Sequence, residues 1–173
     1  MAQDPVKMTP KELKAAVQAE ADERTTPELY FMTARAYHAS ARLLMKNPIP
    51  RLGHGDQPIR ALLHHAVELY LKALLLHSGM SPAQLRGRHG HDYEQLVDEA
   101  LKRGLVLAPV FVATLETLQE LGAFSLARYP FVGTKRLIAL EVLSSLCNEL
   151  APLIGPQVLG TIPPARGDII EPI

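Results

Sequence analysis

Two neighbouring histidines and an arginine carry the most obvious chemistry in this sequence. Arg60, His64 and His65 fall within residues 59–79, which have the pattern of one long helix. Imidazole can act as a general acid or base near neutral pH, and a guanidinium can hold a phosphate group. These side chains are therefore candidates for phosphate binding or for metal-independent cleavage of RNA. The alternative, which we favour, is a polar stripe where helices or subunits meet.

A second candidate group lies in a later loop and at the start of the helix that follows it. Its members are Arg128, Tyr129, Lys135 and Arg136. A helix N-terminus attracts anions, an arginine fork fits phosphate, and a tyrosine ring can stack on a base. Equally, Tyr129 could plug the end of a helix bundle while Arg128 pairs with a carboxylate such as Glu68. The sequence leaves both interpretations open.

A third group lies in a glycine-containing loop, where Arg86 and Arg88 are suited to phosphate contact. Solvated loop charge is the simpler explanation for them. The run from His89 to Asp92 has the side-chain types of a metal site, but no further ligand pair stands at motif spacing. The chain also lacks a phosphate-binding loop, a dinucleotide fingerprint and a nucleophile elbow. We therefore predict no metal and no cofactor.

The elements that must position these groups are helices. Apolar residues recur at helical spacing, and Pro, Gly and capping residues mark the ends. The expected helices span about 11–22, 27–46, 59–79, 93–103, 109–121 and 135–150. No segment shows the alternation of a strand. The sequence thus predicts an all-α fold, an antiparallel four-helix up-and-down bundle with an extra N-terminal helix and an irregular C-terminal tail.

One domain is expected over residues 1–152, with its core in residues 27–150. Pro152 should close the last helix, because proline cannot continue a helix, and residues 153–173 should be extended or disordered. The helix within 59–79 is apolar around most of its circumference and should therefore lie at the centre. Leu69 is expected deep in the core. The polar residues of this helix form one line, spaced four apart: Arg60, His64, Glu68 and Lys72.

Composition narrows the classes of protein further. The chain has 18 Lys and Arg against 18 Asp and Glu, so no overall charge draws it to nucleic acid or anionic lipid. Its single cysteine, Cys147, excludes an intrachain disulfide framework and a cysteine-rich zinc site. The N-terminus lacks the apolar run of a signal peptide, and charges interrupt the central helix too often for a membrane span. We expect a cytoplasmic protein without membrane contact.

An alanine- and glutamate-containing helix that ends at a glycine is followed here by a His-Asp pair that opens the next helix. The residues of this pattern are Ala66, Glu68, Leu71, Lys72, Ala73, Leu74, Gly79, His91 and Asp92. The pattern resembles the HEPN domain family, although Tyr93 replaces the usual leucine. Residues 33–44 are similar to the first bundle helix of that family. The resemblance covers about residues 27–150.

The resemblance implies a cytoplasmic, dimeric and mostly prokaryotic domain. Such domains are linked to toxin–antitoxin or antiviral systems, to RNA cleavage, or to a nucleotidyltransferase partner. RNA-cleaving members carry an arginine followed after four to six residues by a histidine, near the start of a late bundle helix. Arg128 has no such histidine here. The one matching spacing, Arg60 to His65, lies in the central helix and spans about 500° around its axis, which puts the two on different faces.

The leading hypothesis is a HEPN-like dimeric module that associates with RNA or a nucleotide and lacks the cleavage motif. One alternative is an active ribonuclease that uses Arg60 with His64 or His65, and another is a protein-interaction module without a small ligand. Whether the chain is an enzyme stays open. We expect a homodimer, because helix 11–22 has a thin apolar face that must lie on the bundle surface or on a second subunit.

Overall fold

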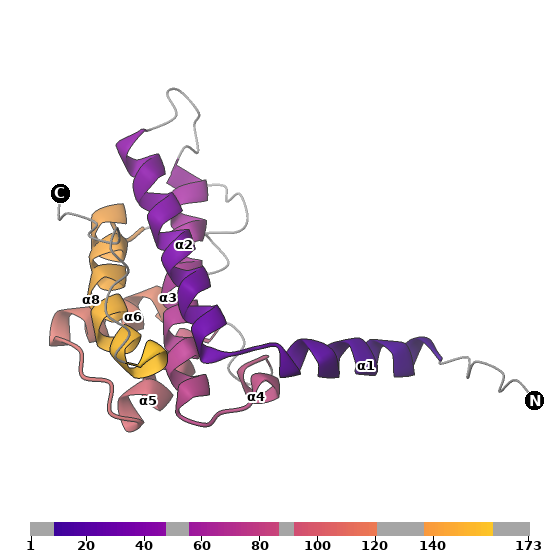
Figure 1. The fold of residues 1–173 in the computed structure, drawn as a ribbon. Coiled ribbons are helices and arrows are strands. Elements are labelled where there is room, and N and C mark those ends of the chain that lie inside the picture. Colours follow the sequence, from indigo (N-terminus) through magenta and orange to yellow (C-terminus); the bar gives the residue numbers. More distant parts are fainter. Residues whose placement is uncertain (1–8, 48–55, 87–91, 121–136, 161–173) are drawn as a thin grey trace, which may run out of the picture.

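The computed structural model describes residues 9–47, 56–86, 92–120 and 137–160. These ranges contain helices and no strand, which confirms the predicted all-α class (Figure 1). The helices are α1 (Pro10–Glu23), α2 (Pro27–Lys46), α3 (Asp56–His77), α4 (Pro82–Arg86), α5 (Tyr93–Lys102), α6 (Pro109–Glu120) and α8 (Leu140–Leu159). None of the helices in these ranges combines the length and apolarity that crossing a membrane requires.

Capping residues set the helix boundaries where the sequence placed them. The Thr9 hydroxyl accepts a hydrogen bond from the Glu12 N–H, and the Glu12 carboxylate accepts one from the Thr9 N–H at 2.7 Å. The Thr26 hydroxyl and the Asp92 carboxylate accept hydrogen bonds from the Leu29 and Gln95 N–H groups at the starts of α2 and α5. Gly79 follows α3 with a φ of 89°, a left-handed conformation that glycine adopts without strain. These local signals decide where most of the helices begin and end.

Helix α3 lies at the centre, as predicted. It packs against α2, α8 and α5, while α2 also contacts α8, and α6 packs on α5. Leu63, Leu71 and Leu75 of α3 are fully buried. The small residues Ala66 and Ala73 are buried as well, so neighbouring helices come close to the α3 backbone.

Phe31 of α2 joins the three long helices. Its ring meets the Tyr70 ring of α3 edge-on, with 5.4 Å between the ring centroids. On the other side, a Cβ atom placed on Gly155 of α8 would lie only 2.9 Å from the tip of the Phe31 ring. Gly155 therefore permits a close approach of α8 to α2 that any larger residue would prevent.

The predicted end of the last helix was wrong. The sequence placed a helix at 135–150 and expected Pro152 to stop it, but α8 continues to Leu159 and contains both Pro152 and Pro156. The extended chain expected from residue 153 is therefore helical as far as Leu159. Residues 135 and 136 and the tail beyond residue 160 lie outside the described residues.

Burial explains why α8 tolerates its prolines. A proline inside a helix costs about 3 kcal/mol, because it lacks the N–H donor and crowds the carbonyl four residues earlier. Beyond Pro152, Ile154 is fully buried and Val158 is 4% exposed. Burying such side chains stabilises by about 1.5–3 kcal/mol each, which offsets a large part of the penalty of the two prolines. Tertiary packing thus overrides a local stop signal.

Helix α1 extends away from the other helices as an arm (Figure 1). It buries none of its residues, and Leu13 and Val17 on its apolar face are 55% and 58% exposed. The suggestion that this helix lies on its own bundle surface is wrong for this structure. Its apolar face has no cover within the described part of the chain.

Candidate functional site

The polar line of α3, which comprises Arg60, His64, Glu68 and Lys72, turns into the protein. His64 and Glu68 are each 3% exposed and Lys72 is 7% exposed. By contrast Leu69, which we expected deep in the core, is only partly buried. The polar line therefore lies at a seam between helices, in agreement with the interpretation that we favoured, and the prediction that Leu69 lies deep in the core was wrong.

His64 is locked to α5 by two hydrogen bonds. The Tyr93 hydroxyl donates to the His64 carbonyl oxygen at 2.9 Å, and His64 Nδ1 lies 3.1 Å from the same hydroxyl oxygen. Since the hydroxyl proton is used on the carbonyl, Nδ1 carries the ring proton and donates it to Tyr93. Burial, with the nearby charges of Arg60 and His65, lowers the pKa of His64 to about 4. The ring is therefore neutral at physiological pH.

Arg60 and His65 point to other partners. A guanidinium N–H of Arg60 donates to the backbone carbonyl of Ile138, just before α8, and Nη2 lies 3.8 Å from the Asp56 carboxylate. The His65 ring lies beside the Tyr37 ring of α2, with 5.4 Å between centroids. The structure thus brings Arg60 near His64 but gives each of the three side chains a separate contact.

Further along the polar line, Lys72 Nζ lies 2.6 Å from Glu68 Oε1. The two side chains are 9% and 4% exposed, so both charges are withdrawn from water. An ion pair at this depth is tolerated only when the partners neutralise one another in good geometry. Both residues belong to the family-like motif, and here they meet each other inside the protein.

We expect the two buried histidines to make the protein less stable in mild acid. Burial also lowers the pKa of His38 to about 4, with a further effect of Arg42, and His38 Nε2 lies 3.3 Å from Ser144 Oγ. A histidine whose folded pKa lies below its ordinary 6.5 stabilises the fold fully above pH 6.5, and this contribution falls as the pH drops towards 4. The midpoint of urea unfolding, measured between pH 7.5 and 4.5, should therefore fall.

The matched variants are His38→Gln and His64→Gln, each of which removes one buried titrating group. Both should flatten the pH dependence, even where they lower stability at pH 7.5. His77→Gln changes an exposed residue at the end of α3 and serves as the control. If the wild-type midpoint does not change between pH 7.5 and 5, the histidines are not buried as described.

Of the loop cations predicted to bind a ligand, only Arg86 lies within the described residues. Its guanidinium forms a two-pronged ion pair with Asp22 at the end of α1, and Nη2 lies 2.7 Å from Oδ2. This contact raises the pKa of Arg86 and lowers that of Asp22. Arg86 thus fastens α1 to α4. The remaining predicted ligand residues lie outside the described ranges: Arg88, Arg128, Tyr129, Lys135 and Arg136.

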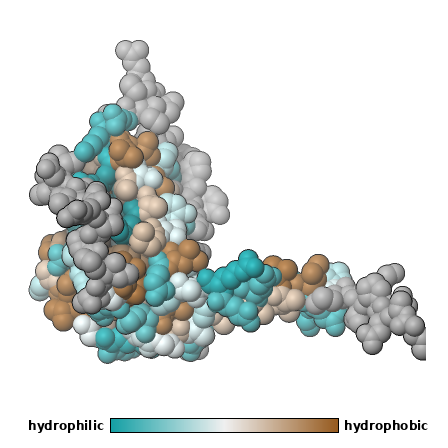
Figure 2. All heavy atoms as spheres, in the orientation of Figure 1, coloured by the Kyte–Doolittle hydropathy of each residue, from teal (hydrophilic) through white to brown (hydrophobic). Residues whose placement is uncertain are grey.

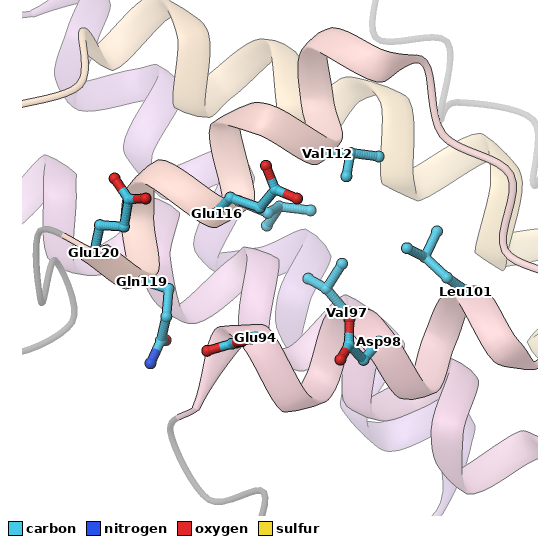
Figure 3. Close-up of a pocket in the computed structure, with 9 residues that line it drawn as sticks. Glu94, Val97, Asp98, Leu101, Val112, Glu116, Gln119 and Glu120 are labelled. Atoms are coloured by element: carbon cyan, nitrogen blue, oxygen red, sulfur yellow. The ribbon is translucent and has the colours of Figure 1, made fainter.

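A groove between α5 and α6 was missed at the sequence level. It has a volume of about 310 Å³ and an apolar floor formed by Val97, Leu101, Val112 and Leu115. Carboxylates surround this floor, with Gln119 beside them (Figure 3): Glu94, Asp98, Glu116 and Glu120. We call this the acidic groove. Its signal in the sequence is two carboxylates spaced four apart on each of two amphipathic helices.

The carboxylates of the acidic groove are not grouped in the way that a metal ion requires. In residues 9–47, 56–86, 92–120 and 137–160, no group of three or more His, Cys, Asp or Glu side chains is arranged to hold a metal ion. A rim of carboxylates around an apolar floor instead suits a ligand that is itself apolar and basic. The groove therefore joins the polar line as a second place where the described chain offers specific chemistry.

No family model, curated protein or solved structure matches this chain. The HEPN resemblance therefore stays with its motif residues, whose described members have structural positions: Ala66 and Ala73 are buried, Gly79 ends α3 and Asp92 caps α5. The motif thus coincides with the helix pair α3 and α5 that frames the polar line.

Proposed function

We propose that this chain is a HEPN-like module that binds RNA or a nucleotide as a homodimer and does not cleave RNA. The proposed lack of cleavage rests on His64, whose side chain is buried, neutral and hydrogen-bonded to Tyr93. The antiparallel four-helix up-and-down bundle of the family is part of this proposal. So are a cytoplasmic location, a prokaryotic source and a place in a toxin–antitoxin or defence system.

The argument against cleavage rests on what a general base must do. It needs a pKa near the working pH and an open path to the proton that it removes. His64 has neither, since its pKa is about 4 and its side chain is covered. Arg60 donates to the Ile138 carbonyl, and His65 lies against Tyr37. These contacts support the interpretation that the three side chains are structural residues at a seam between helices.

Ligand binding is assigned to the loop group Arg128, Tyr129, Lys135 and Arg136. Guanidinium and ammonium groups would hold phosphate, and the tyrosine ring would stack on a base. In a homodimer, two copies of this group would concentrate positive charge that the balanced whole-chain charge conceals. A nucleotidyltransferase or an antitoxin is the expected partner protein.

A second candidate function is a protein-interaction module without a small ligand. The acidic groove and the uncovered apolar face of α1 favour it, because both are surfaces that a folded partner could cover. This candidate shares the lack of catalysis with the first. The two differ in whether the protein binds RNA.

The test is an assay of both cleavage and binding with labelled single-stranded RNA. We expect no cleavage above background, with or without Mg²⁺, and binding that weakens as salt rises, because phosphate contacts release counterions. Arg128→Ala and Lys135→Ala should each weaken binding by about tenfold if each removes one charged contact. Lys102→Ala, which removes an exposed lysine of α5, is the control and should bind as the wild type does.

Two outcomes would replace the proposal. Cleavage that disappears in Arg60→Ala or His65→Ala would establish a ribonuclease. Absence of binding to RNA and to nucleoside mono-, di- and triphosphates would leave the interaction module as the function.

A further inference from the structure

We propose that the outward face of α2 is a dimer interface, on which α2 of a second copy of this chain lies antiparallel. The proposal rests on the proposed homodimer, for which it names the surface, and it does not depend on RNA binding. We call this face the outer stripe, and its members are Leu29, Met32, Ala36, Ser40 and Leu43.

The outer stripe lies on the side of α2 that is turned away from the core. Successive residues of a helix are about 100° apart, which places the stripe about 180° from the buried residues of α2. Those buried residues are Phe31, Ala34, His38 and Ala41. On the stripe, Leu29, Met32 and Leu43 are 52%, 50% and 63% exposed. Figure 2 shows hydrophobic residues towards both ends of α2, with paler residues between them. A helix that is apolar on two opposite faces is typical of one with neighbours on both sides.

The positions of the outer stripe are symmetric about Ala36. Leu29 and Leu43 each lie seven residues from Ala36, while Met32 and Ser40 each lie four residues from it. In an antiparallel pair with a twofold axis at Ala36, that residue meets its own copy, Met32 meets Ser40, and Leu29 meets Leu43. The small residues at the centre let the two helices approach closely, and leucines pack at both ends. The stripe is therefore complementary to a second copy of itself.

The charges beside the outer stripe favour the same arrangement. Glu28 lies in the first turn of α2 and Lys46 in the last turn. They are 18 residues apart, which is about five complete turns, so both lie on one side of the helix beside the stripe. Neither forms an ion pair within the described residues. In the antiparallel pair, Glu28 of each copy lies beside Lys46 of the other, with a difference of about 3 Å along the helix axis.

The other charged residues of α2 do not oppose this pairing. Arg35 and Arg42 lie about 100° and 120° from the middle of the outer stripe, towards the core, and both are only partly exposed. His38 belongs to the buried face and is neutral at pH 7, because burial lowers its pKa to about 4. No charged residue therefore lies on the stripe between Leu29 and Leu43. A parallel pair would instead bring like-charged ends and like ends of the helix dipoles together.

The size of the contact sets the expected affinity. Two single helices of 20 residues make a smaller interface than a standard stable complex. We therefore expect a dimer dissociation constant of about 1–100 μM. The assembly should depend on protein concentration over this range.

The first experiment is a cysteine cross-link at the proposed twofold axis. Ala36 is exposed, and Cys147 is fully buried and does not interfere with an introduced thiol. Under mild oxidation Ala36→Cys should give a covalent dimer of twice 19.0 kDa as the main product, because the two Cα atoms lie within disulfide distance. Val110→Cys, at an exposed position of α6, is the control and should give little dimer. Equal yields from the two variants would overturn the proposal.

The same method tests the orientation of the two helices. A mixture of Leu29→Cys and Leu43→Cys should form a covalent dimer, because these positions meet in the antiparallel pair. Each variant alone should form little, because its two copies lie about 21 Å apart along the pair. A dimer of Leu29→Cys alone that forms as well as the dimer of the mixture would overturn the antiparallel arrangement.

The second experiment measures mass by light scattering coupled to gel filtration across this range of concentrations. Ala36→Glu places two carboxylates against each other at the centre of the pair, so the dissociation constant should rise at least tenfold. Far-UV circular dichroism confirms that the variant is folded. Val110→Glu is the matched control and should dimerise as the wild type does.

A charge exchange tests the ends of the pair. Lys46→Glu should raise the dissociation constant by about three- to tenfold, because two exposed ion pairs are lost, and Glu28→Lys in the same chain should reverse this rise.

The outcomes separate this proposal from the proposed function. A dimer that survives Ala36→Glu unchanged would overturn the pairing through α2 and leave the homodimer intact. A wild-type mass near 19.0 kDa at every concentration would overturn both the pairing and the homodimer. RNA binding is measured in its own assay, so its failure is distinguishable from either result.

Discussion

Replacing Lys72 with methionine is expected to destabilise the protein by about 3–5 kcal/mol. The substitution removes the ammonium group that lies 2.6 Å from Glu68 Oε1, while the Glu68 carboxylate stays 3% exposed in the interior. The Glu68 carboxylate then keeps the cost of leaving water but loses the attraction of this ammonium group, which offset part of that cost. Urea unfolding at pH 7 measures the change as a shift of the midpoint.

The informative control is the double variant Glu68→Leu with Lys72→Met. It removes both charges and keeps similar volumes, so its stability should lie within about 1 kcal/mol of the wild type or above it. The coupling energy from the full cycle should then be large. If Lys72→Met alone costs less than 1 kcal/mol, the attraction of the Lys72 ammonium group is not what keeps the Glu68 carboxylate in the interior.

The second large effect is expected at Phe31. Phe31→Ala should cost about 3–5 kcal/mol, because it removes a ring that is 3% exposed and leaves a cavity between α2, α3 and α8. Leu43→Ala, on an exposed position of the same helix, is the matched control and should change stability little. Both are measured by urea unfolding.

Gly155 provides the test of the contact itself. Gly155→Ala places a methyl group 2.9 Å from the Phe31 ring tip and should cost about 1–3 kcal/mol through overpacking. In a Phe31→Leu background the ring tip is absent, so the same alanine should cost much less. If the two costs are equal, the approach of α8 to α2 is not limited by this pair of residues.

Helix boundaries were largely predictable because their signals are local. Thr9, Thr26 and Asp92 cap helices through side chains that reach backbone groups only three residues away. The central position of α3 followed from apolar residues around most of its circumference. These features depend on a few neighbours in sequence, and a reader of the sequence sees all of those neighbours at once.

The rotation of α3 was not predictable on the same basis. Leu69 is more apolar than His64, yet His64 is the more buried of the two. The reason is Tyr93 of α5, which supplies a hydroxyl to satisfy the His64 ring and carbonyl. Burying a polar residue costs little free energy when a partner from another helix forms hydrogen bonds with it. The sequence alone does not show which helices will pack together.

The candidate site also has features that the sequence predicted and features that it did not. The sequence named Arg60, His64 and His65 as a group, but their separate contacts depend on Ile138, Tyr93 and Tyr37, which come from distant parts of the chain. The acidic groove depends on α5 and α6 lying side by side, as Figure 3 shows. Its carboxylates looked like ordinary solvated charges in each helix alone. Spatial pairing of two helices, rather than any residue type, makes the groove.

The ion pair between Asp22 and Arg86 lies at one end of α1, so a small change of angle there moves the other end of the helix by a larger distance. A 14-residue helix is about 21 Å long, so a tilt of about 10° at its root displaces its tip by roughly 4 Å. The pair is partly open to water, with side-chain exposures of 27% and 38%, and dissolved salt weakens contacts of this kind. We therefore expect the position of the far end of α1 to depend on ionic strength. A small weakening of the ion pair at the root of the helix permits a larger displacement at its other end.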